Sequence, residues 1–140
     1  MAFEQEAAYE AAQDLESCTV SCVVTEDMLE KKLGCGDTDT YAIGMMVSLM
    51  EQAAKQLAEK YLPAGMTTIG VMMNATHVAP TVLGNEVRAT ATLLERGDGQ
   101  FYFEIIASDN MGTIGEATHH RVAVSLDRFN EKAKKRGRLS

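Results

Sequence analysis

The sequence predicts an α+β fold in which one antiparallel sheet curls around a single long helix. Three observations predict it: a strand-like segment precedes the helix, the helix is apolar over more than one stripe, and four strand-like segments follow it. No second helix of comparable length is indicated. Both the apolar helix and the dry face of the sheet must be buried, and wrapping the sheet around the helix buries both at once.

The chain ahead of the long helix predicts a strand followed by a brief helix. Residues 17–25 (SCTVSCVVT) are dense in β-branched side chains, as strands are. Thr25 is placed to cap a brief helix that stops at Gly34, where the turn-rich loop GCGDTDT begins. Residues 2–16, rich in Ala and Glu, predict a leading helix or an ordered extension.

The principal helix is expected from about residue 41 to residue 62. Pro63 and Gly65 end it, because neither continues a helix well. Apolar side chains recur along it at spacings of three or four: Met46, Met50, Ala53, Leu57 and Tyr61. Its middle carries few charges, which indicates that the sheet covers more than one side of it.

Four segments after the helix predict an antiparallel meander. They cover residues 67–79, 86–96, 101–109 and 113–126, and short turns separate them. Apolar and polar residues alternate in the second and third, so the sheet has one dry face and one wetter face. A strand, a long helix and a meander wrapped around it make the hot-dog arrangement. From Asp127 onwards, a polar and basic segment is expected to close the chain as a small helix.

Length, charge and composition bound the class of protein. A chain of 140 residues, 46% of them hydrophobic, fits one domain over residues 1–140, with an extension at 1–16 and a basic tail at 127–140. The formal net charge of -7 argues against nucleic acid as a partner, since phosphate contacts need a basic face. The start is acidic, and no apolar run approaches the roughly 20 residues of a membrane span. We therefore expect a cytoplasmic protein without membrane contact.

The three cysteines predict neither a disulfide framework nor a metal site. Their number is odd, and the sequence has no CxxC motif and no paired histidines at zinc-finger spacing. Cys18 and Cys22 share one face of the first strand, where we expect ordinary buried residues. Cys35 stands between two glycines in the loop. We expect no metal and no resident cofactor.

Two polar side chains interrupt apolar surfaces that face each other. The odd positions of residues 67–79 are otherwise apolar, which puts His77 on the face towards the helix. Taken alone, such a histidine is more often a core residue whose ring nitrogens are hydrogen-bonded within the protein. Glu51 is the only acid between Asp39 and Glu59. The alternative to a functional role is that Glu51 lies at the exposed margin of the helix. A carboxylate buried beside an imidazole would shift both pKa values towards neutrality, so together they favour a functional pair.

The start of the helix and the last strand supply further candidates. Ala42, Ile43 and Gly44 leave little side-chain bulk near unpaired backbone N–H groups that can receive a carbonyl oxygen. In IGEATHHR, His119 and Arg121 share one strand face and His120 faces the other way. Arg121 either contacts an anionic substrate or pairs with an acid of the protein, and the ion pair is at least as well supported.

Three blocks of the sequence resemble the fluoroacetyl-CoA thioesterase-like family of hot-dog proteins. They are YAIGMMVSLMEQAA in the helix, TTIGVMMNATHVAPTVLG in the strand after it, and IGEATHHRVAV in the last strand. Their most specific parts are LMExA, TxGxxxxxxHxAPT and IGxxTHxR, which occur in the family's order and with similar spacing. The resemblance spans roughly residues 18–135.

This resemblance implies a homodimer, possibly paired further into a tetramer, with thioester sites at the subunit interface. Two helices would lie side by side under one continuous sheet. By the same similarity, Glu51 and His77 match catalytic positions, Gly70 matches a residue whose backbone lies near the bound acyl group, and Arg121 matches an arginine near the site. Coenzyme A would enter as part of the substrate.

The sequence departs from the family's pattern at three positions. Ile43 stands where the fluoroacetyl-specific enzymes have a threonine, Ala117 replaces a frequent glycine, and Cys35 replaces a serine that is common in the wider family. These changes leave the expected fold untouched. The loss of a hydroxyl at position 43 argues against fluoroacetyl-CoA as the substrate.

Three functions remain open on the sequence, in decreasing order of support. The first is an acyl-CoA thioesterase in which Glu51 or His77 activates water against a short or medium acyl thioester. The second is a non-catalytic protein that binds acyl-CoA or a pantetheine thioester, which the missing hydroxyl at Ile43 favours. The third is a hot-dog hydratase or dehydratase, although the sequence lacks the HFPxxPxxPG stretch of the dehydratases.

Overall fold

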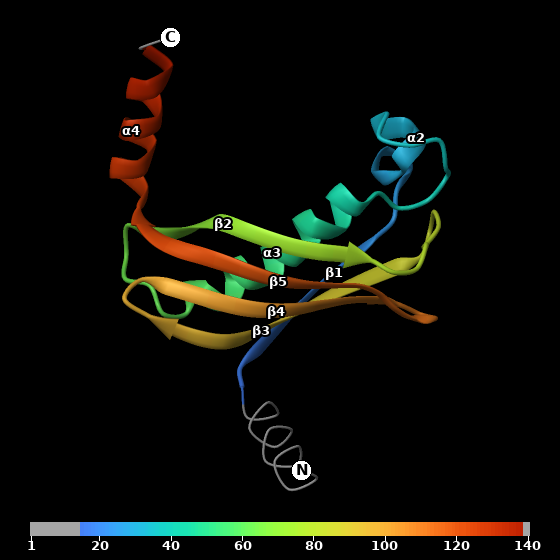
Figure 1. Ribbon diagram of the computed structural model, residues 1–140, viewed down its shortest axis with the longest axis horizontal. Coiled ribbons are helices and arrows are strands. Elements are labelled where there is room, and N and C mark those ends of the chain that lie inside the picture. The colour runs from blue at the N-terminus through green and yellow to red at the C-terminus, as the bar shows by residue number, and fades with distance from the viewer. Residues whose placement is uncertain (1–14, 139–140) are drawn as a thin grey trace, which may run out of the picture.

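The computed structural model describes residues 15–138, which form one five-stranded sheet and a long helix lying against it (Figure 1). In chain order the elements are β1 (Ser17–Val23), η1 (Glu26–Met28), α2 (Glu30–Leu33), α3 (Ile43–Glu59), β2 (Met66–His77), β3 (Glu86–Gly97), β4 (Gln100–Asp109), β5 (Gly112–Ser125) and α4 (Leu126–Arg138). Each predicted strand is present, with its ends within two residues of the predicted ones. The long helix is shorter than predicted by two residues at its start and three at its end.

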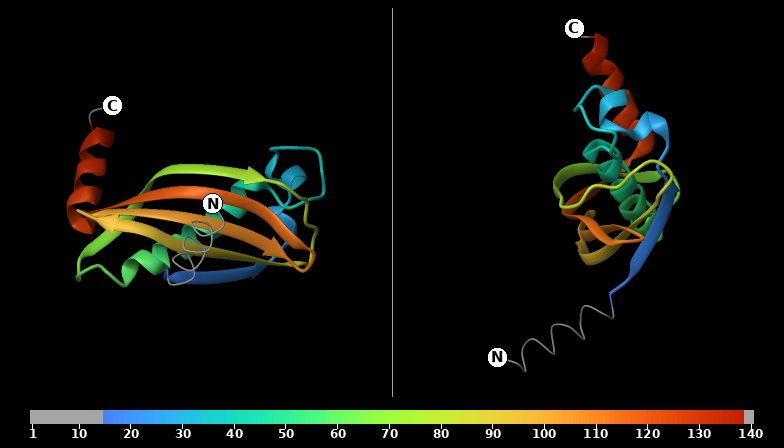
Figure 2. Two further views of the ribbon diagram at one scale, coloured as in Figure 1. Left: turned by 60° about the horizontal axis from the view of Figure 1, so that its bottom comes forward. Right: turned by 90° about the vertical axis from the view of Figure 1, so that its right-hand side faces the viewer.

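The sheet is antiparallel throughout and has the strand order β1-β3-β4-β5-β2. The last four strands of the chain pair as the predicted meander, except that β2 joins the far side of β5 and so becomes an edge strand. Figure 2 shows the sheet curving around α3, which runs along its concave side. The predicted hot-dog arrangement is therefore confirmed.

The core lies between α3 and the concave face of the sheet. Seven side chains of the helix are buried: Met46, Leu49, Met50, Ala53, Ala54, Leu57 and Ala58. They pack against every second residue of β3 and β4, from Val87 to Leu93 and from Phe101 to Ala107. This confirms the predicted alternation in those strands, and it leaves one side of α3, including Ser48 and Gln52, exposed.

The predicted alternation along β2 is wrong in its first half because the strand contains a bulge. The pairing with β5 shifts between Gly70 and Met72, so the intervening Val71 is extra and is 51% exposed. Ahead of the bulge it is Thr68 that is buried. Beyond it the odd positions face the helix as predicted, and His77 is among them.

The segment between β1 and α3 differs in detail from the prediction. A 3₁₀ turn and the four-residue helix α2 replace a single brief helix, and Thr25 makes no capping hydrogen bond. Gly34 does end α2, in the left-handed conformation with φ of 78° that glycine adopts readily. Cys18 and Cys22 share one face of β1, as predicted, although both are half-buried rather than buried.

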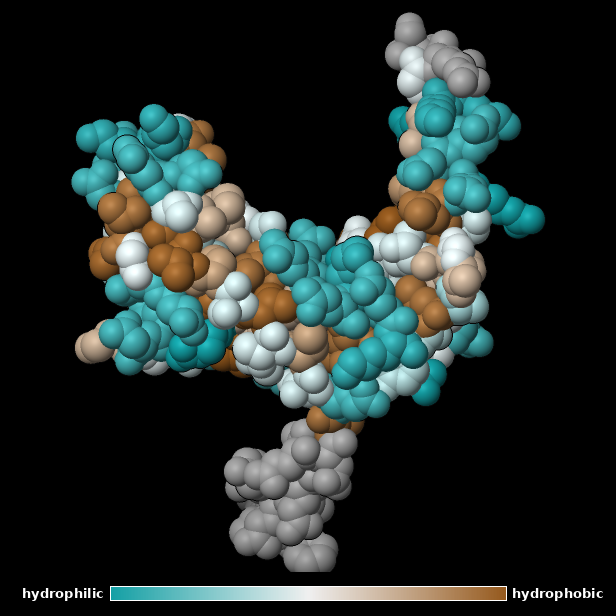
Figure 3. Space-filling view, turned by 180° about the vertical axis from the view of Figure 1, so that it is seen from behind, coloured by the Kyte–Doolittle hydropathy of each residue, from teal (hydrophilic) through white to brown (hydrophobic). Residues whose placement is uncertain are grey.

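The basic segment after β5 forms the predicted helix, α4, which projects from the end of the sheet as a hydrophilic rod (Figures 1 and 3). The predicted leading helix over residues 2–16 falls almost entirely outside the described residues. No helix within residues 15–138 is both long enough and apolar enough to cross a membrane.

Candidate active site

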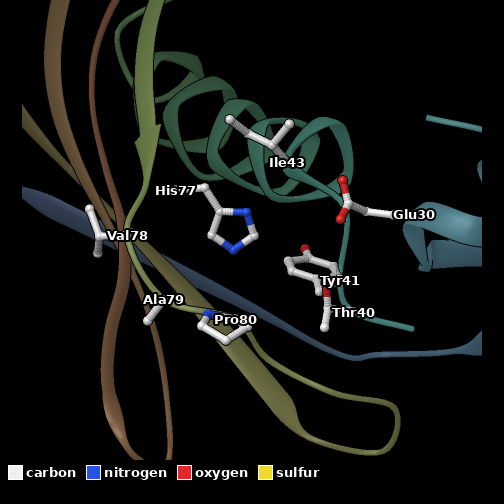
Figure 4. A pocket seen from close by; sticks show the side chains of 8 residues that line it. All are labelled: Glu30, Thr40, Tyr41, Ile43, His77, Val78, Ala79 and Pro80. Carbon is white, nitrogen blue, oxygen red and sulfur yellow. The ribbon is translucent and has the colours of Figure 1, made fainter. Parts of the chain in front are cut away.

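A cleft of about 370 Å³ opens where α3 begins and β2 ends (Figure 4). Its walls come from α2, from the residues that lead into α3, and from the end of β2 with the loop after it. The lining residues are Glu30, Thr40, Tyr41, Ile43, His77, Val78, Ala79 and Pro80. His77 and Ile43 therefore lie in the same cleft.

His77 presents an unused hydrogen-bonding atom in this cleft. Its ring lies edge-on to Tyr41, with ring centroids 6.5 Å apart, and its Nε2 atom is buried without a hydrogen-bond partner in the part of the chain that the structure describes. Burial lowers the pKa of His77, while the charge of Glu30 and the backbone of Ala79 act in the opposite direction. His77 is therefore neutral at pH 7 and able to accept a proton.

The start of α3 is open, as predicted. The helix begins at Ile43, and the side chain of its N-cap residue, Ala42, makes no capping hydrogen bond. As first residues of a helix, Ile43 and Gly44 have backbone N–H groups without an intrahelical acceptor. A Cβ added at Gly44 would meet nothing within 4 Å, and the side chain of Ile43 is 44% exposed. These N–H groups are accessible to a carbonyl oxygen.

A second polar cluster centres on Arg121, whose side chain is almost fully buried. Its Nε donates to Thr68 Oγ1 at 2.8 Å, and its Nη2 donates to the Thr68 carbonyl at 2.9 Å. Its Nη1 donates to Glu51 Oε2 at 3.3 Å. Of the two readings of Arg121 left open by the sequence, the ion pair with an acid of the protein is the one observed.

His119 completes this cluster as a neutral side chain. Arg121 Nη1 lies 3.2 Å from His119 Nε2, and since a guanidinium only donates, Nε2 must accept. The proton then sits on Nδ1, which donates to the Met72 carbonyl at 2.7 Å. Burial is the main cause that lowers the pKa of His119, in keeping with this neutral form. His120 faces the other way, as predicted, and stacks on Tyr102.

Gly70 lies against the carboxylate of Glu51. A Cβ at position 70 would be 2.9 Å from Glu51 Oε2, 3.1 Å from His119 Cε1 and 3.3 Å from Arg121 Nη1. The absence of a side chain there leaves the space that the carboxylate occupies. Glu51 is otherwise 44% exposed, so its position is the helix margin rather than the interior.

Within one chain the structure does not bring Glu51 and His77 together. Glu51 lies beside Gly70, and His77 is seven residues further along β2, a separation of about 20 Å along the strand. The site residues predicted from the sequence thus fall into two groups. Ile43 and His77 line the cleft, and Gly44 follows Ile43 at the helix start. Glu51, Gly70, His119 and Arg121 cluster along the middle of β2, where Gly70 pairs with Arg121 and Met73 pairs with His119.

Three residues with a part in these groups were not predicted. Glu30 and Tyr41 line the cleft, and Thr68 anchors Arg121. Gly70 inside a strand was a signal for the bulge that turns Thr68 inwards, since glycine in a strand interior often marks one. Within residues 15–138, no group of three or more His, Cys, Asp or Glu side chains is arranged to hold a metal ion.

Comparison with solved structures identifies the class first. A hot-dog-like protein from Thermanaerovibrio acidaminovorans superposes with a TM-score of 0.78 at 21% identity, covering 87% of this chain and 90% of that chain, so the fold is the hot-dog fold. The family described as fluoroacetyl-CoA-specific thioesterase matches residues 24–127. The chain belongs to this family.

Individual relatives agree with the family assignment. The fluoroacetyl-CoA thioesterase of Streptantibioticus cattleyicolor is 33% identical over 98 residues, which are 70% of this chain and 70% of the relative. A variant of the fluoroacetyl-CoA thioesterase FlK, solved in complex with fluoro-acetate, superposes with a TM-score of 0.83 at 29% identity, covering 87% of this chain and 96% of that chain. The predicted resemblance is confirmed.

Proposed function

We propose that this protein is an acyl-CoA thioesterase that hydrolyses a short or medium acyl thioester to the free acid and coenzyme A. One observation carries the proposal: His77, whose buried Nε2 atom has no hydrogen-bond partner among residues 15–138, lines the same cleft as the exposed start of α3. A base and a set of oxyanion donors at one place are what hydrolysis of a thioester requires. The named relatives, which are thioesterases, support it.

We further propose that the complete site forms between two copies of the chain. The edge strand β2 has no strand partner on its outer side among the described residues, and its exposed middle includes Val71 and Met72. If two copies pair β2 antiparallel about a twofold axis between Met73 and Asn74, Gly70 of one copy lies opposite His77 of the other. Glu51 of the first copy, which lies against Gly70, then approaches that His77.

In the proposed reaction, neutral His77 takes a proton from water while the water oxygen attacks the thioester carbonyl. The backbone N–H groups at Ile43 and Gly44 receive the developing oxyanion. Glu51 of the partner subunit, held by Arg121, stabilises the imidazolium that forms. The tetrahedral intermediate then collapses, the carbon–sulfur bond breaks, and the coenzyme A thiolate takes up the proton.

A second function, non-catalytic binding of acyl-CoA, is favoured by Ile43. An apolar side chain there cannot hydrogen-bond to the thioester or to water, whereas a threonine could. The cleft of such a protein would hold the thioester without turning it over.

Thiol release from a panel of acyl-CoAs of two to ten carbons tests both functions. We expect turnover of at least one neutral acyl-CoA by the wild-type protein and its loss in His77→Ala, with His120→Ala on the outer face as the matched control. Calorimetric binding of the same acyl-CoAs without turnover would favour the binding protein. Light scattering should give the mass of a dimer or tetramer, and a monomer would refute the shared site.

A further inference from the structure

We propose that Glu30 is a specificity-determining residue: its carboxylate, in the cleft that holds His77, favours acyl groups that carry a hydroxyl and disfavours acyl groups that end in a carboxylate. The inference rests on the proposed function, since it takes this cleft as the acyl site. Figure 4 shows the Glu30 carboxylate turned into the cleft from the side opposite His77.

The chain holds the Glu30 carboxylate in place. Thr38 Oγ1 donates to Glu30 Oε1 at 2.6 Å, and Thr38 lies 2.8 Å from Thr40 Oγ1, whose hydroxyl must be the donor in that second bond because Thr38 has only one proton to give. The backbone is fixed as well, since Glu30 N donates to the Thr40 carbonyl at 2.9 Å. The carboxylate is therefore a fixed feature of the cleft wall.

The glycine at position 36 supports the same placement. A Cβ there would lie 2.8 Å from Glu30 Oε2, so any other residue would push the carboxylate away. Oε2 itself has no hydrogen-bond partner within residues 15–138, which leaves it free to accept one from a ligand. A carboxylate only accepts, and a bound hydroxyl would satisfy it.

No cation in the described part of the cleft compensates this charge, and Arg121 of the partner subunit, which the shared site would bring nearby, is already paired with Glu51. Of the eight lining residues only His77 can become positive, and burial lowers the pKa of its ring. Lys31 and Lys32, which follow Glu30 in the chain, line a separate depression together with Glu26. An acyl group ending in a carboxylate would therefore place two like charges in one partly desolvated space, while a hydroxyl would donate to Oε2.

The test uses three acyl-CoAs of equal chain length: propanoyl-CoA, 3-hydroxypropanoyl-CoA and malonyl-CoA. For the wild-type protein we expect kcat/KM to decrease in the order hydroxyacyl, alkyl, carboxyacyl. Glu30→Gln keeps an oxygen that can accept from Thr38, so the fold should persist. In this variant the hydroxyacyl-to-carboxyacyl ratio of kcat/KM should fall by at least about tenfold.

Two further variants make the test specific. Glu26→Gln removes the same charge from the neighbouring turn, outside the cleft, and should leave the ratio unchanged. Thr38→Val frees the Glu30 carboxylate and should lower the ratio by about threefold, a smaller change than Glu30→Gln because the charge remains. An equal change on all three substrates in Glu30→Gln would overturn the proposal, because it would place Glu30 beside the common pantetheine arm.

Failure of the proposed function would be seen separately. If the wild-type protein releases thiol from none of the three and from no acyl-CoA of the two-to-ten-carbon panel, the function is wrong, and the same ratio is then measured as dissociation constants by calorimetry. A ratio that Glu30→Gln leaves unchanged in binding as well as in turnover refutes the role of Glu30.

Discussion

The two histidines that face α3 differ in how completely they are bonded. His119 is 2% exposed and uses both ring nitrogens, one towards Met72 and one towards Arg121. His77 lies at the end of β2, beyond Met73, which pairs with His119, and it is half-buried beside an open cleft with Nε2 unused. A fully bonded imidazole fixes its neighbours in place, whereas a free nitrogen beside a cleft is available for proton transfer. Inward orientation alone therefore does not make a histidine catalytic.

The sharpest test of this contrast removes the unbonded imidazole of His77 and, separately, the carboxylate of Glu51 that the shared site would bring to it. On whichever acyl-CoA is hydrolysed, His77→Ala and Glu51→Ala should each lower kcat by about 10²- to 10⁴-fold, the usual cost of losing a positioned acid or base. Thiol release under saturating substrate measures it, with circular dichroism to confirm folding. Folded variants with wild-type rates would show that neither side chain takes part in the chemistry.

Mixing the two variants tests whether Glu51 of one copy meets His77 of the other across a dimer. In a hybrid of His77→Ala with Glu51→Ala, one of the two shared sites is intact, so random subunit exchange should restore about a quarter of wild-type activity. A site contained within one chain predicts no recovery. The measurement is thiol release after unfolding and refolding the mixture, with each variant refolded alone as the control.

The fold was predictable because its signals are local and repeated. Alternation in β3 and β4 and the apolar spacing of α3 each hold over many residues. The relation between Glu51 and His77 was not predictable, because it depends on where a helix crosses a strand. The bulge at Val71 was not predicted either, since apolar residues occupy the odd positions on both sides of it and the alternation looks unbroken in the sequence. Nor did the short, charged helix α2 give a sign that Glu30 turns inwards.

Substitutions at position 43 test whether the missing hydroxyl limits activity. Ile43→Thr keeps the β-branch, so the backbone preference should change little, and the stability cost at this half-exposed site should stay below about 2 kcal/mol. We expect kcat/KM on acetyl-CoA to rise at least about tenfold, equivalent to about 1.4 kcal/mol of barrier. Ile43→Val, which removes volume without adding a hydroxyl, is the matched control. Equal effects of both variants would assign the gain to volume alone.

A substitution at Gly70 tests how accurately the Glu51 carboxylate must be positioned for catalysis. A Cβ in Gly70→Ala would press on the Glu51 carboxylate, the mobile end of a side chain that is 44% exposed, and more weakly on the buried side chains of His119 and Arg121, so the carboxylate should shift at a stability cost of about 1 to 2 kcal/mol. We expect kcat to fall by about tenfold, because a displacement of this size weakens a positioned group. Gly97→Ala, where an added Cβ meets nothing within 4 Å, is the matched control. Unchanged kcat in Gly70→Ala would mean that the resting position of Glu51 is not the one used in catalysis.

The smallest effect expected is a loss of stability in mild acid through His119. Burial lowers the pKa of His119 in the folded chain, so the unfolded chain takes up the proton first, at its ordinary pKa of about 6.5. The contribution of neutral His119 to the free energy of unfolding is therefore fully present above pH 6.5. It is lost as the pH falls from there towards the folded pKa, by about 1.4 kcal/mol for each pH unit between the two pKa values. Protonation would also make Nε2 a donor that faces Arg121 Nη1, which is itself a donor to Nε2 in the neutral state.

His119→Gln removes this titration while retaining an amide that can donate to the Met72 carbonyl. Chemical denaturation at pH 7.5 and pH 5.5 should therefore show a smaller acid-induced loss in His119→Gln than in the wild-type chain. An equal loss in both proteins would mean that His119 is not held neutral by this network.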